Sequence, residues 1–300
     1  MQRKTSFLMT LNISGRLVDL SIPQVMGIIN ATPDSFYAGS RTLMPDSLLR
    51  RAEEMIEQGT TILDIGACST RPGSAPVSVD EELRRLDTAL TALMPLRDRH
   101  PDILISIDTF RADVARRCVR DHGIHIINDI SAGQLDEAMF TTVADLHTPY
   151  VLTHNPAPDP ASPAASLTPP LGSKEHSPEP DPSFLPAVAR FFAECLSALY
   201  SLGIADVILD PGFGFGKTIA ENYLLLRRLD DLVRLFPDNP FLIGISRKSM
   251  ICRVLNISPD EALNGTTVLN TLALQAGAHI LRVHDVRPAV EAIRLCRAFN

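Results

Sequence analysis

Short apolar runs alternate with longer amphipathic segments through most of this chain of 300 residues. Apolar runs of four to six residues, bounded by Gly, Pro and Asp, are typical of buried strands. The segments between them have helical spacing, so strand and helix repeat about eight times. The predicted strands are residues 24–29, 61–66, 103–107, 124–128, 149–153, 206–210, 241–245 and 279–283. The predicted helices begin at 46 and then span 79–97, 111–121, 135–146, 183–202, 219–235, 259–276 and 286–298.

This repetition predicts an α/β fold, a TIM-type (β/α)8 barrel. Residues 5–22 alternate around Ser14-Gly15-Arg16 and indicate a β-hairpin. A barrel needs its bottom end closed, so we place the hairpin there. Because the repetition runs nearly the whole length, we expect residues 1–300 to form a single domain.

One stretch, residues 155–182, breaks the rhythm. It holds nine of the chain's 23 prolines and almost no apolar periodicity. Such a composition buries too little to order itself, and predicts a mobile loop after the fifth strand. A tolerated insertion is the favoured interpretation, and a lid over a substrate is the alternative.

Composition narrows the function classes. A net charge of −7 and the lack of a basic run argue against a nucleic-acid partner. The five cysteines are widely spaced with no C-x-x-C pair, which indicates reduced thiols rather than disulfides or a zinc site. No apolar run is long enough to span a membrane, and the N-terminal stretch is too broken for a signal peptide. We therefore expect a cytoplasmic protein without a membrane partner.

The residues that follow the strands should carry the chemistry, because in such a barrel they converge on one rim. Cations suited to phosphate oxygens lie beside carboxylates, which suggests a ligand with an anionic end and a polar ring. Any single strand-terminal Asp is as often a structural ion-pair partner. The residues expected to share one pocket are Asn30, Arg71, Asp108, Asn128, Asp210, Lys248, Arg282 and His284. Further rim candidates are the cations Lys217 and Arg247 and the carboxylates Asp64, Asp129 and Asp285.

Two motifs have tempting alternative interpretations. The stretch 210–218 (DPGFGFGKT) is no phosphate-binding P-loop, because Pro211 stands where that motif needs Gly. Its glycines favour a tight turn and close approach of the backbone to a flat ligand. SRKS at 246–249 is equally compatible with a site and with surface ion pairs. The histidines never cluster, so a loosely held Mg²⁺ fits better than a transition metal, and a lone His154 is more often packed than a ligand.

Seven motifs, taken in order, resemble those of the dihydropteroate synthase family. They are MGIINATPDSF, DIGACSTRPG, SIDT, INDISAG, DPGFGFGK, ISRKS and RVHDV, and they cover roughly residues 24–287. The resemblance implies a TIM-type barrel, commonly a homodimer, and a transferase of folate biosynthesis that sulfonamides inhibit. It implies condensation of dihydropterin-CH₂-diphosphate with 4-aminobenzoate, giving 7,8-dihydropteroate and diphosphate.

The resemblance also implies roles for individual residues. Pterin binding falls to Asp108, Asn128, Ile130, Asp210, Lys248 and Arg282. Diphosphate binding falls to Asn30, Thr70, Arg71, Arg282 and His284, with Asn30 also on Mg²⁺. The 4-aminobenzoate pocket falls to Ser69, Thr70, Arg71, Pro72, Phe215 and Ser249. Catalysis falls to Arg71, Asp108, Asp210, Lys248, Arg282 and His284, which stabilise a dissociative displacement.

The chain departs from the family pattern at three positions. Ala38 removes a carboxylate near the metal, Cys68 replaces an acidic or polar residue, and Asn155 replaces a methionine that packs on the pterin. These departures keep a non-catalytic pterin-binding paralogue open as an alternative. A pterin-dependent methyltransferase is a second alternative, although a methyl transfer has no use for so many phosphate-directed cations.

Overall fold

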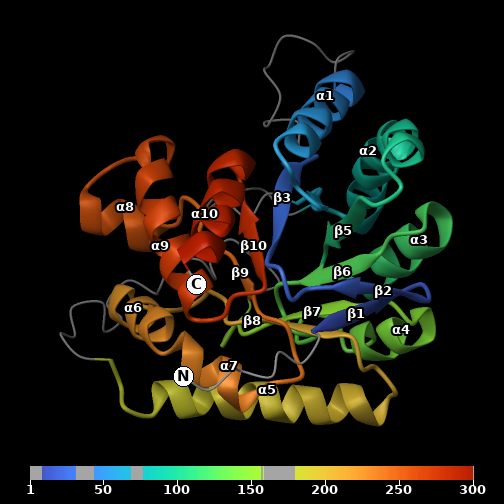
Figure 1. Ribbon diagram of the computed structural model, residues 1–300. Coiled ribbons are helices and arrows are strands. Elements are labelled where there is room, and N and C mark those ends of the chain that lie inside the picture. The colour runs from blue at the N-terminus through green and yellow to red at the C-terminus, as the bar shows by residue number, and fades with distance from the viewer. Residues whose placement is uncertain (1–8, 32–43, 69–76, 157, 159–179, 300) are drawn as a thin grey trace.

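The computed structural model describes residues 9–31, 44–68, 77–156, 158 and 180–299. Its strands alternate with helices along the chain, and Figure 1 shows the helices arranged around the strands. The order is β1 (Thr10–Ile13), β2 (Arg16–Asp19), β3 (Gln24–Asn30), α1 (Met44–Glu57), β4 (Ile62–Gly66), α2 (Val79–Arg99), β5 (Leu104–Asp108), α3 (Ala112–His122), β6 (Ile126–Asp129), α4 (Met139–Leu146), β7 (Tyr150–Thr153), α5 (Phe184–Ser201), β8 (Val207–Asp210), α6 (Ile219–Arg227), α7 (Leu229–Leu235), β9 (Leu242–Ile243), α8 (Ser249–Leu255), α9 (Leu263–Gln275), β10 (Ile280–Val283) and α10 (Val286–Phe299).

Eight parallel strands form the central sheet, in the order β8-β7-β6-β5-β4-β3-β10-β9. The two ends of this series meet, because Leu209 pairs with Phe241 in a parallel bridge. The Leu209 amide also donates to the Pro240 carbonyl at 2.8 Å. The sheet therefore closes on itself, and the predicted (β/α)8 barrel is confirmed.

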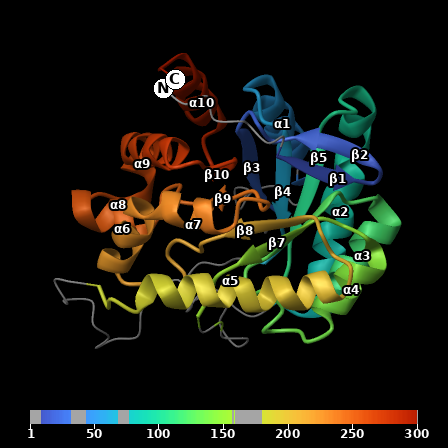
Figure 2. The same ribbon diagram turned by 60° about the horizontal axis from the view of Figure 1, so that its bottom comes forward.

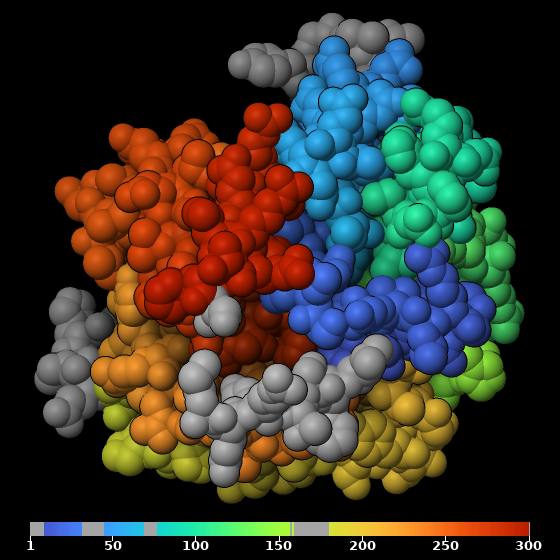
Figure 3. All heavy atoms as spheres, viewed as in Figure 1, coloured from blue at the N-terminus to red at the C-terminus, as the bar shows by residue number. Residues whose placement is uncertain are grey.

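The hairpin β1–β2 covers the bottom of the barrel, as predicted. Its apolar side chains Leu11, Ile13 and Leu20 are buried against one inward-pointing residue from each barrel strand. Those eight residues are Met26, Ile62, Leu104, Ile126, Val151, Ile208, Leu242 and Ile280. In the space-filling view of Figure 3 the dark blue hairpin lies beside the red surface of α10, and Figure 2 shows the hairpin from a second side.

A second, larger apolar core fills the space between the strands and the surrounding helices. Helices α2 and α5 illustrate why: each buries one stripe, such as Leu86, Leu90 and Leu93 of α2, and exposes the rest. None of the described helices is both long and apolar enough to cross a membrane.

Four predicted boundaries were wrong. The predicted strand 241–245 is reduced to the two residues of β9, Leu242–Ile243. The chain then leaves the sheet in a turn, in which the Lys248 amide donates to the Ile245 carbonyl. The predicted helix 219–235 is two helices, broken at Arg228. The predicted helix 259–276 begins with a 3₁₀ turn, and the helix predicted from 135 begins at 139. In the latter, Asp136 caps other amides instead of joining the helix. The Pro-rich segment 155–182 lies mostly outside the described residues.

Candidate active site

The barrel mouth is polar for a reason visible in the strands themselves. Side chains of a strand alternate between its faces, so residues two apart point the same way. Two residues beyond the apolar bottom layer, the inward position becomes polar: Asp64 follows Ile62, and Arg282 follows Ile280. The same step gives Asn128 on β6, Asp210 on β8 and, two steps up β5, Asp108.

Register brings these residues to one level. Gly66 of β4 pairs with Asp108, which in turn pairs with Asn128. Gly66 lies directly beside Asp108, since a Cβ on Gly66 would be in ordinary van der Waals contact, 3.5 Å from the Asp108 Cβ. The convergence predicted for Asp108, Asn128, Asp210, Lys248 and Arg282 is therefore what the barrel produces.

Arg282 is the centre of this cluster. Its Nε and Nη2 donate to Asp64 Oδ2 at 2.7 and 2.6 Å, and its Nη2 also donates to Asp108 Oδ2 at 2.7 Å. Asn128 Nδ2 donates to the same Asp64 oxygen at 3.0 Å. Asp64 is fully buried, and its Oδ1 has no hydrogen-bond partner. A buried carboxylate is tolerated only when it is paired, so Asp64 and Arg282 hold one another in place.

Burial dominates the proton equilibria here. It raises the pKa of Asp108 to about 7, helped by Asp64, although the Arg282 charge opposes the rise. The pKa of Asp210 is also raised by burial, against the opposing charge of Lys248. The pKa of Lys248 falls to about 8, because desolvation outweighs the attraction of Asp210. The pKa values of Asp108 and Lys248 therefore lie near neutral pH, as those of functional groups often do.

The loop after β8 supports Lys248. Gly212 and Gly214 have positive φ values of 69° and 83°, as glycine allows. A Cβ on Gly212 would lie 2.1 Å from the His154 carbonyl oxygen, so the chain passes too close for any other residue. The Lys248 ammonium donates to the Phe213 carbonyl and lies 4.6 Å from the centre of the Phe215 ring. The predicted tight turn is confirmed.

Several rim candidates are structural instead. Lys217 is buried, and its ammonium donates to the carbonyls of His154, Gly212 and Phe215, so it holds the loop and does not face a ligand. Arg247 makes a two-pronged pair with Asp285, with both distances 2.9 Å.

Two further rim candidates are also occupied within the protein. Asp129 accepts from Tyr150, Ser131 and Gly133. His154, as expected, is packed: its ring lies edge-on 4.9 Å from Phe191.

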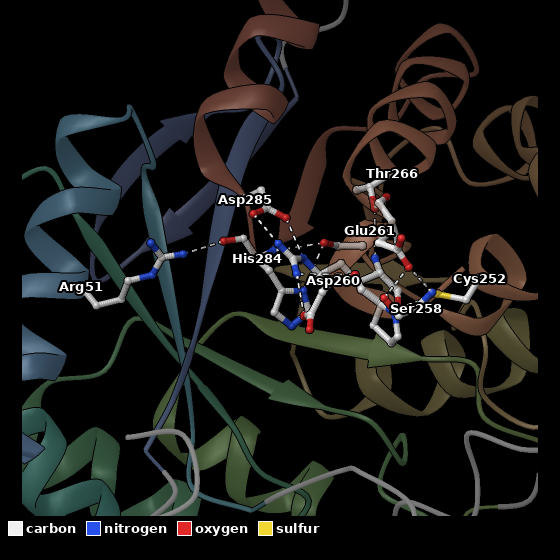
Figure 4. Close-up of polar contacts among 12 residues, drawn as sticks. Arg51, Cys252, Ser258, Asp260, Glu261, Thr266, His284 and Asp285 are labelled. Atoms are coloured by element: carbon white, nitrogen blue, oxygen red, sulfur yellow. Dashed lines mark hydrogen bonds and ion pairs between the residues drawn. The ribbon is translucent and has the colours of Figure 1, made fainter. Parts of the chain in front are cut away.

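His284, predicted to bind diphosphate, lies at the mouth beside Ser246. Burial and the nearby Arg282 lower its pKa to about 4, so the imidazole is neutral at pH 7. Its Nδ1 lies 3.1 Å from the Ser246 hydroxyl, and its backbone carbonyl accepts from Arg51 at 2.8 Å (Figure 4). A neutral imidazole offers one ring nitrogen as a donor and the other as an acceptor.

The other predicted site residues are divided between the mouth and the undescribed part of the chain. Asn30 is exposed at the end of β3, Ile130 is buried just after β6, and Ser249 begins α8. Phe215 lies beneath the Lys248 ammonium. Ser69, Thr70, Arg71 and Pro72 lie outside the described residues, as does Ala38.

Sequence reasoning missed a second buried network, centred on Glu82. Glu82 of α2 is fully buried, accepts from Thr109 at 2.7 Å and pairs with Arg111. Arg111 also donates to the Val77 carbonyl at 2.7 Å, while Arg85 donates to the Ala67 carbonyl at 3.0 Å. Helical periodicity gave no signal, because Glu82 sits in an acidic first turn where exposure is usual.

Asn155, at the position of one family departure, is also buried. Its Nδ2 donates to the Ile130 carbonyl at 3.2 Å, and its Oδ1 has no partner. The residue therefore packs against a predicted pterin-binding position, with one polar atom left over.

Comparison with known proteins shows which family the chain belongs to. Residues 26–284 match the model of the pterin binding enzyme family. The chain is 39% identical to a dihydropteroate synthase of Escherichia coli strain K12, covering 97% of this chain and 96% of the relative. It is 35% identical to the dihydropteroate synthase of Bacillus subtilis, covering 91% and 87%.

Solved structures agree. A Yersinia pestis dihydropteroate synthase in complex with a sulfonamide drug aligns with a TM-score of 0.81 and 36% identity, covering 97% of this chain and 99% of that one. A Xanthomonas albilineans dihydropteroate synthase with 4-aminobenzoic acid aligns with a TM-score of 0.83 and 34% identity, covering 98% of both chains. Together with the charged barrel mouth, these matches place the chain in the dihydropteroate synthase family of pterin-binding enzymes.

Proposed function

We propose that this chain condenses (7,8-dihydropterin-6-yl)methyl diphosphate with 4-aminobenzoate, giving 7,8-dihydropteroate and diphosphate. The convergence of Asp108, Asn128, Asp210 and Lys248 around Arg282 is the observation that carries the proposal. A buried set of carboxylate, amide and ammonium groups matches the polar edge of a pterin. A Xanthomonas albilineans relative has been solved in complex with 7,8-dihydropteroate, with 33% identity and a TM-score of 0.79.

Hydrogen bonds already made inside the protein decide which atoms remain for the pterin. Asn128 uses its Nδ2 on Asp64, so its Oδ1 is left to accept an N–H of the ring. Asp210 accepts from the Gly212 amide with Oδ1, which leaves Oδ2 for the 2-amino-pyrimidinone edge. Lys248 donates to a ring oxygen or nitrogen. Arg282, held flat by Asp64 and Asp108, stacks on the ring face.

The reaction is a displacement at the pterin methylene. The C–O bond to the diphosphate breaks, and its electron pair leaves with the diphosphate. Asp108 and Asp210 stabilise the positive charge that develops on the methylene. The neutral arylamine nitrogen of 4-aminobenzoate forms the new C–N bond and then loses a proton to water.

Arg282 and neighbouring residues of the mouth stabilise the leaving diphosphate. Arg282 still has its Nη1 available, since that atom makes no hydrogen bond with the described residues. His284 donates as a neutral imidazole. Asn30, and from the resemblance Thr70 and Arg71, complete the diphosphate site.

Magnesium fits this site as a companion of the diphosphate. Asn30 offers an exposed carboxamide oxygen, a ligand type that Mg²⁺ accepts. Among the described residues there is no group of three His, Cys, Asp or Glu that could hold a metal ion. We therefore infer that Asn30, water and diphosphate oxygens would hold Mg²⁺ together. When bound, it neutralises part of the diphosphate charge.

The 4-aminobenzoate pocket is proposed from Ser69, Thr70, Arg71, Pro72, Phe215 and Ser249. Phe215 and Ser249 come from the loop after β8 and the start of α8, on either side of Lys248. A pocket of this kind also accepts sulfonamides, which resemble 4-aminobenzoate, and a relative from Yersinia pestis has been solved with one.

A homodimer is also proposed. Large apolar side chains are exposed on the adjacent helices α9 and α10, with Val268 50%, Leu272 48% and Leu295 71% exposed. An apolar surface of this kind is typical of a protein interface.

A cytoplasmic location is proposed as well. It agrees with the cysteines, all five of which are free thiols.

The test is diphosphate release by the purified protein with dihydropterin diphosphate, 4-aminobenzoate and Mg²⁺, omitting each in turn. We expect release only with both substrates, with dihydropteroate appearing in step. Binding of the pterin diphosphate without release would instead identify a non-catalytic paralogue. Tighter binding of tetrahydrofolate than of the pterin diphosphate would favour the methyltransferase.

A further inference from the structure

A cavity of about 370 Å³ lies where α1 meets the ends of β3 and β10. Two of the residues around it, Asn30 and His284, belong to the proposed diphosphate site. Ile28 and Ile29 of β3 also line it, and the remaining residues come from α1, to which the sequence motifs assign no role. The polar residues around the cavity are Asn30, Ser47, Arg50, Arg51, Glu54 and His284.

The two arginines of α1 are placed differently. Arg51 donates to the His284 carbonyl at 2.8 Å (Figure 4) and lies 3.5 Å from Glu54, so it ties α1 to the loop after β10. Arg50 is exposed and makes no hydrogen bond or ion pair with the part of the chain that the structure describes. Its charge is available to a ligand in the cavity.

Most of the other cations at the mouth are already paired with carboxylates, which makes Arg50, unpaired among the described residues, important for an anionic ligand. Arg282 is neutralised by Asp64 and Asp108, and Arg247 by Asp285. The half-buried Lys248 lies near Asp210, whose charge acts on it. A diphosphate carries several negative charges, so these paired cations leave most of its charge unmatched. Arg71 is expected to contribute, but it lies outside the described residues.

We propose that the cavity beside α1 is an anion subsite, in which Arg50 binds the terminal phosphate of the diphosphate. The inner phosphate, attached to the pterin methylene, then lies toward Arg282, and the outer one toward Asn30, His284 and Arg50. The proposal rests on the proposed function for the identity of the ligand. It adds a binding residue from a helix, where the other contacts come from the strand ends and their loops.

Titration calorimetry of inorganic diphosphate with Mg²⁺ tests the subsite without needing turnover. We expect Arg50→Ala to weaken diphosphate binding about five- to tenfold, as loss of one charge-assisted contact does. Arg50→Lys keeps the charge and should retain most of the affinity, whereas Arg50→Glu should bind more weakly than Arg50→Ala. Arg120→Ala is the matched control, because Arg120 is also exposed on a helix and makes no ion pair with the described residues.

Kinetics separate the subsite from the reaction. With Arg50→Ala we expect the KM for the pterin diphosphate to rise by a similar factor, with the KM for 4-aminobenzoate unchanged. Equal diphosphate affinity in the wild type, Arg50→Ala and Arg50→Glu would overturn the subsite. Loss of the proposed function looks different: the wild type would then bind diphosphate, with Arg50 contributing, but form no dihydropteroate.

Discussion

The two ends of the same barrel are built from the same strands and are opposite in chemistry. At the bottom, each strand contributes one apolar residue, such as Ile126 or Ile208, to a layer that the hairpin covers. Two residues further along, β6 presents Asn128 and β8 presents Asp210. One step of the pleat, about 7 Å of strand, separates a dry core from a charged site.

The difference shows how stability and function are divided. The bottom layer gains free energy from apolar burial and makes no demand on pairing. The mouth buries carboxylates, which is unfavourable unless they are paired, so Asp64, Asp108 and Arg282 form one network. The bottom therefore supports a site that is itself costly to fold.

The largest expected effect is a loss of activity from a substitution at the mouth of the barrel. Lys248→Ala removes the donor to the pterin and the charge beside Asp210, and should lower kcat/KM by about 10³-fold. The apolar bottom layer is untouched, so circular dichroism and the melting temperature should show a folded protein. Arg71→Ala is expected to behave in the same way. Full activity in both variants would contradict the residue assignment.

The next largest effect is a loss of stability from a substitution in the apolar layer at the bottom of the barrel. Ile126→Ala removes a fully buried side chain from the closed layer and should lower the free energy of unfolding by about 2–5 kcal/mol. Denaturant titration measures this, and kcat/KM of the folded enzyme should stay close to the wild type. Asn128→Ala, two residues away on the same strand, should lower activity instead. Leu17→Ala is the control, since Leu17 is 69% exposed and should change stability by less than about 0.5 kcal/mol.

The smallest effect is a pH dependence, and it belongs to the mouth. The pKa of Asp108 is raised to about 7, so its carboxylate takes up a proton as the pH falls below that value. The pKa of Lys248 is lowered to about 8, so its ammonium loses a proton above that value. We expect kcat/KM to be greatest between these values and to fall about tenfold per pH unit well outside them.

A profile from about pH 5 to about pH 9 checks both limbs. Asp108→Asn should lower the maximum and remove the acidic limb. An unchanged acidic limb in Asp108→Asn would assign that limb to another group.

Sequence patterns were enough to predict the order of strands and helices, the barrel and the convergence of Asp108, Asn128, Asp210, Lys248 and Arg282 at its mouth. The reason is local: a buried strand shows its apolar run, and a barrel brings every strand end to one rim. Asp64, which the sequence predicts only as a further rim carboxylate, lies two residues beyond Ile62 and is fully buried.

Which of the charged side chains are already paired inside the protein became visible only in the folded chain. Lys217 and Arg247 read like ligand-binding cations, but one is buried against backbone carbonyls and the other paired with Asp285. Burial lowers the pKa of His284, and the pair of Glu82 and Arg111 joins α2 to the segment before α3. Pairing and desolvation depend on neighbours that are distant in the chain, so residue type and spacing cannot report them.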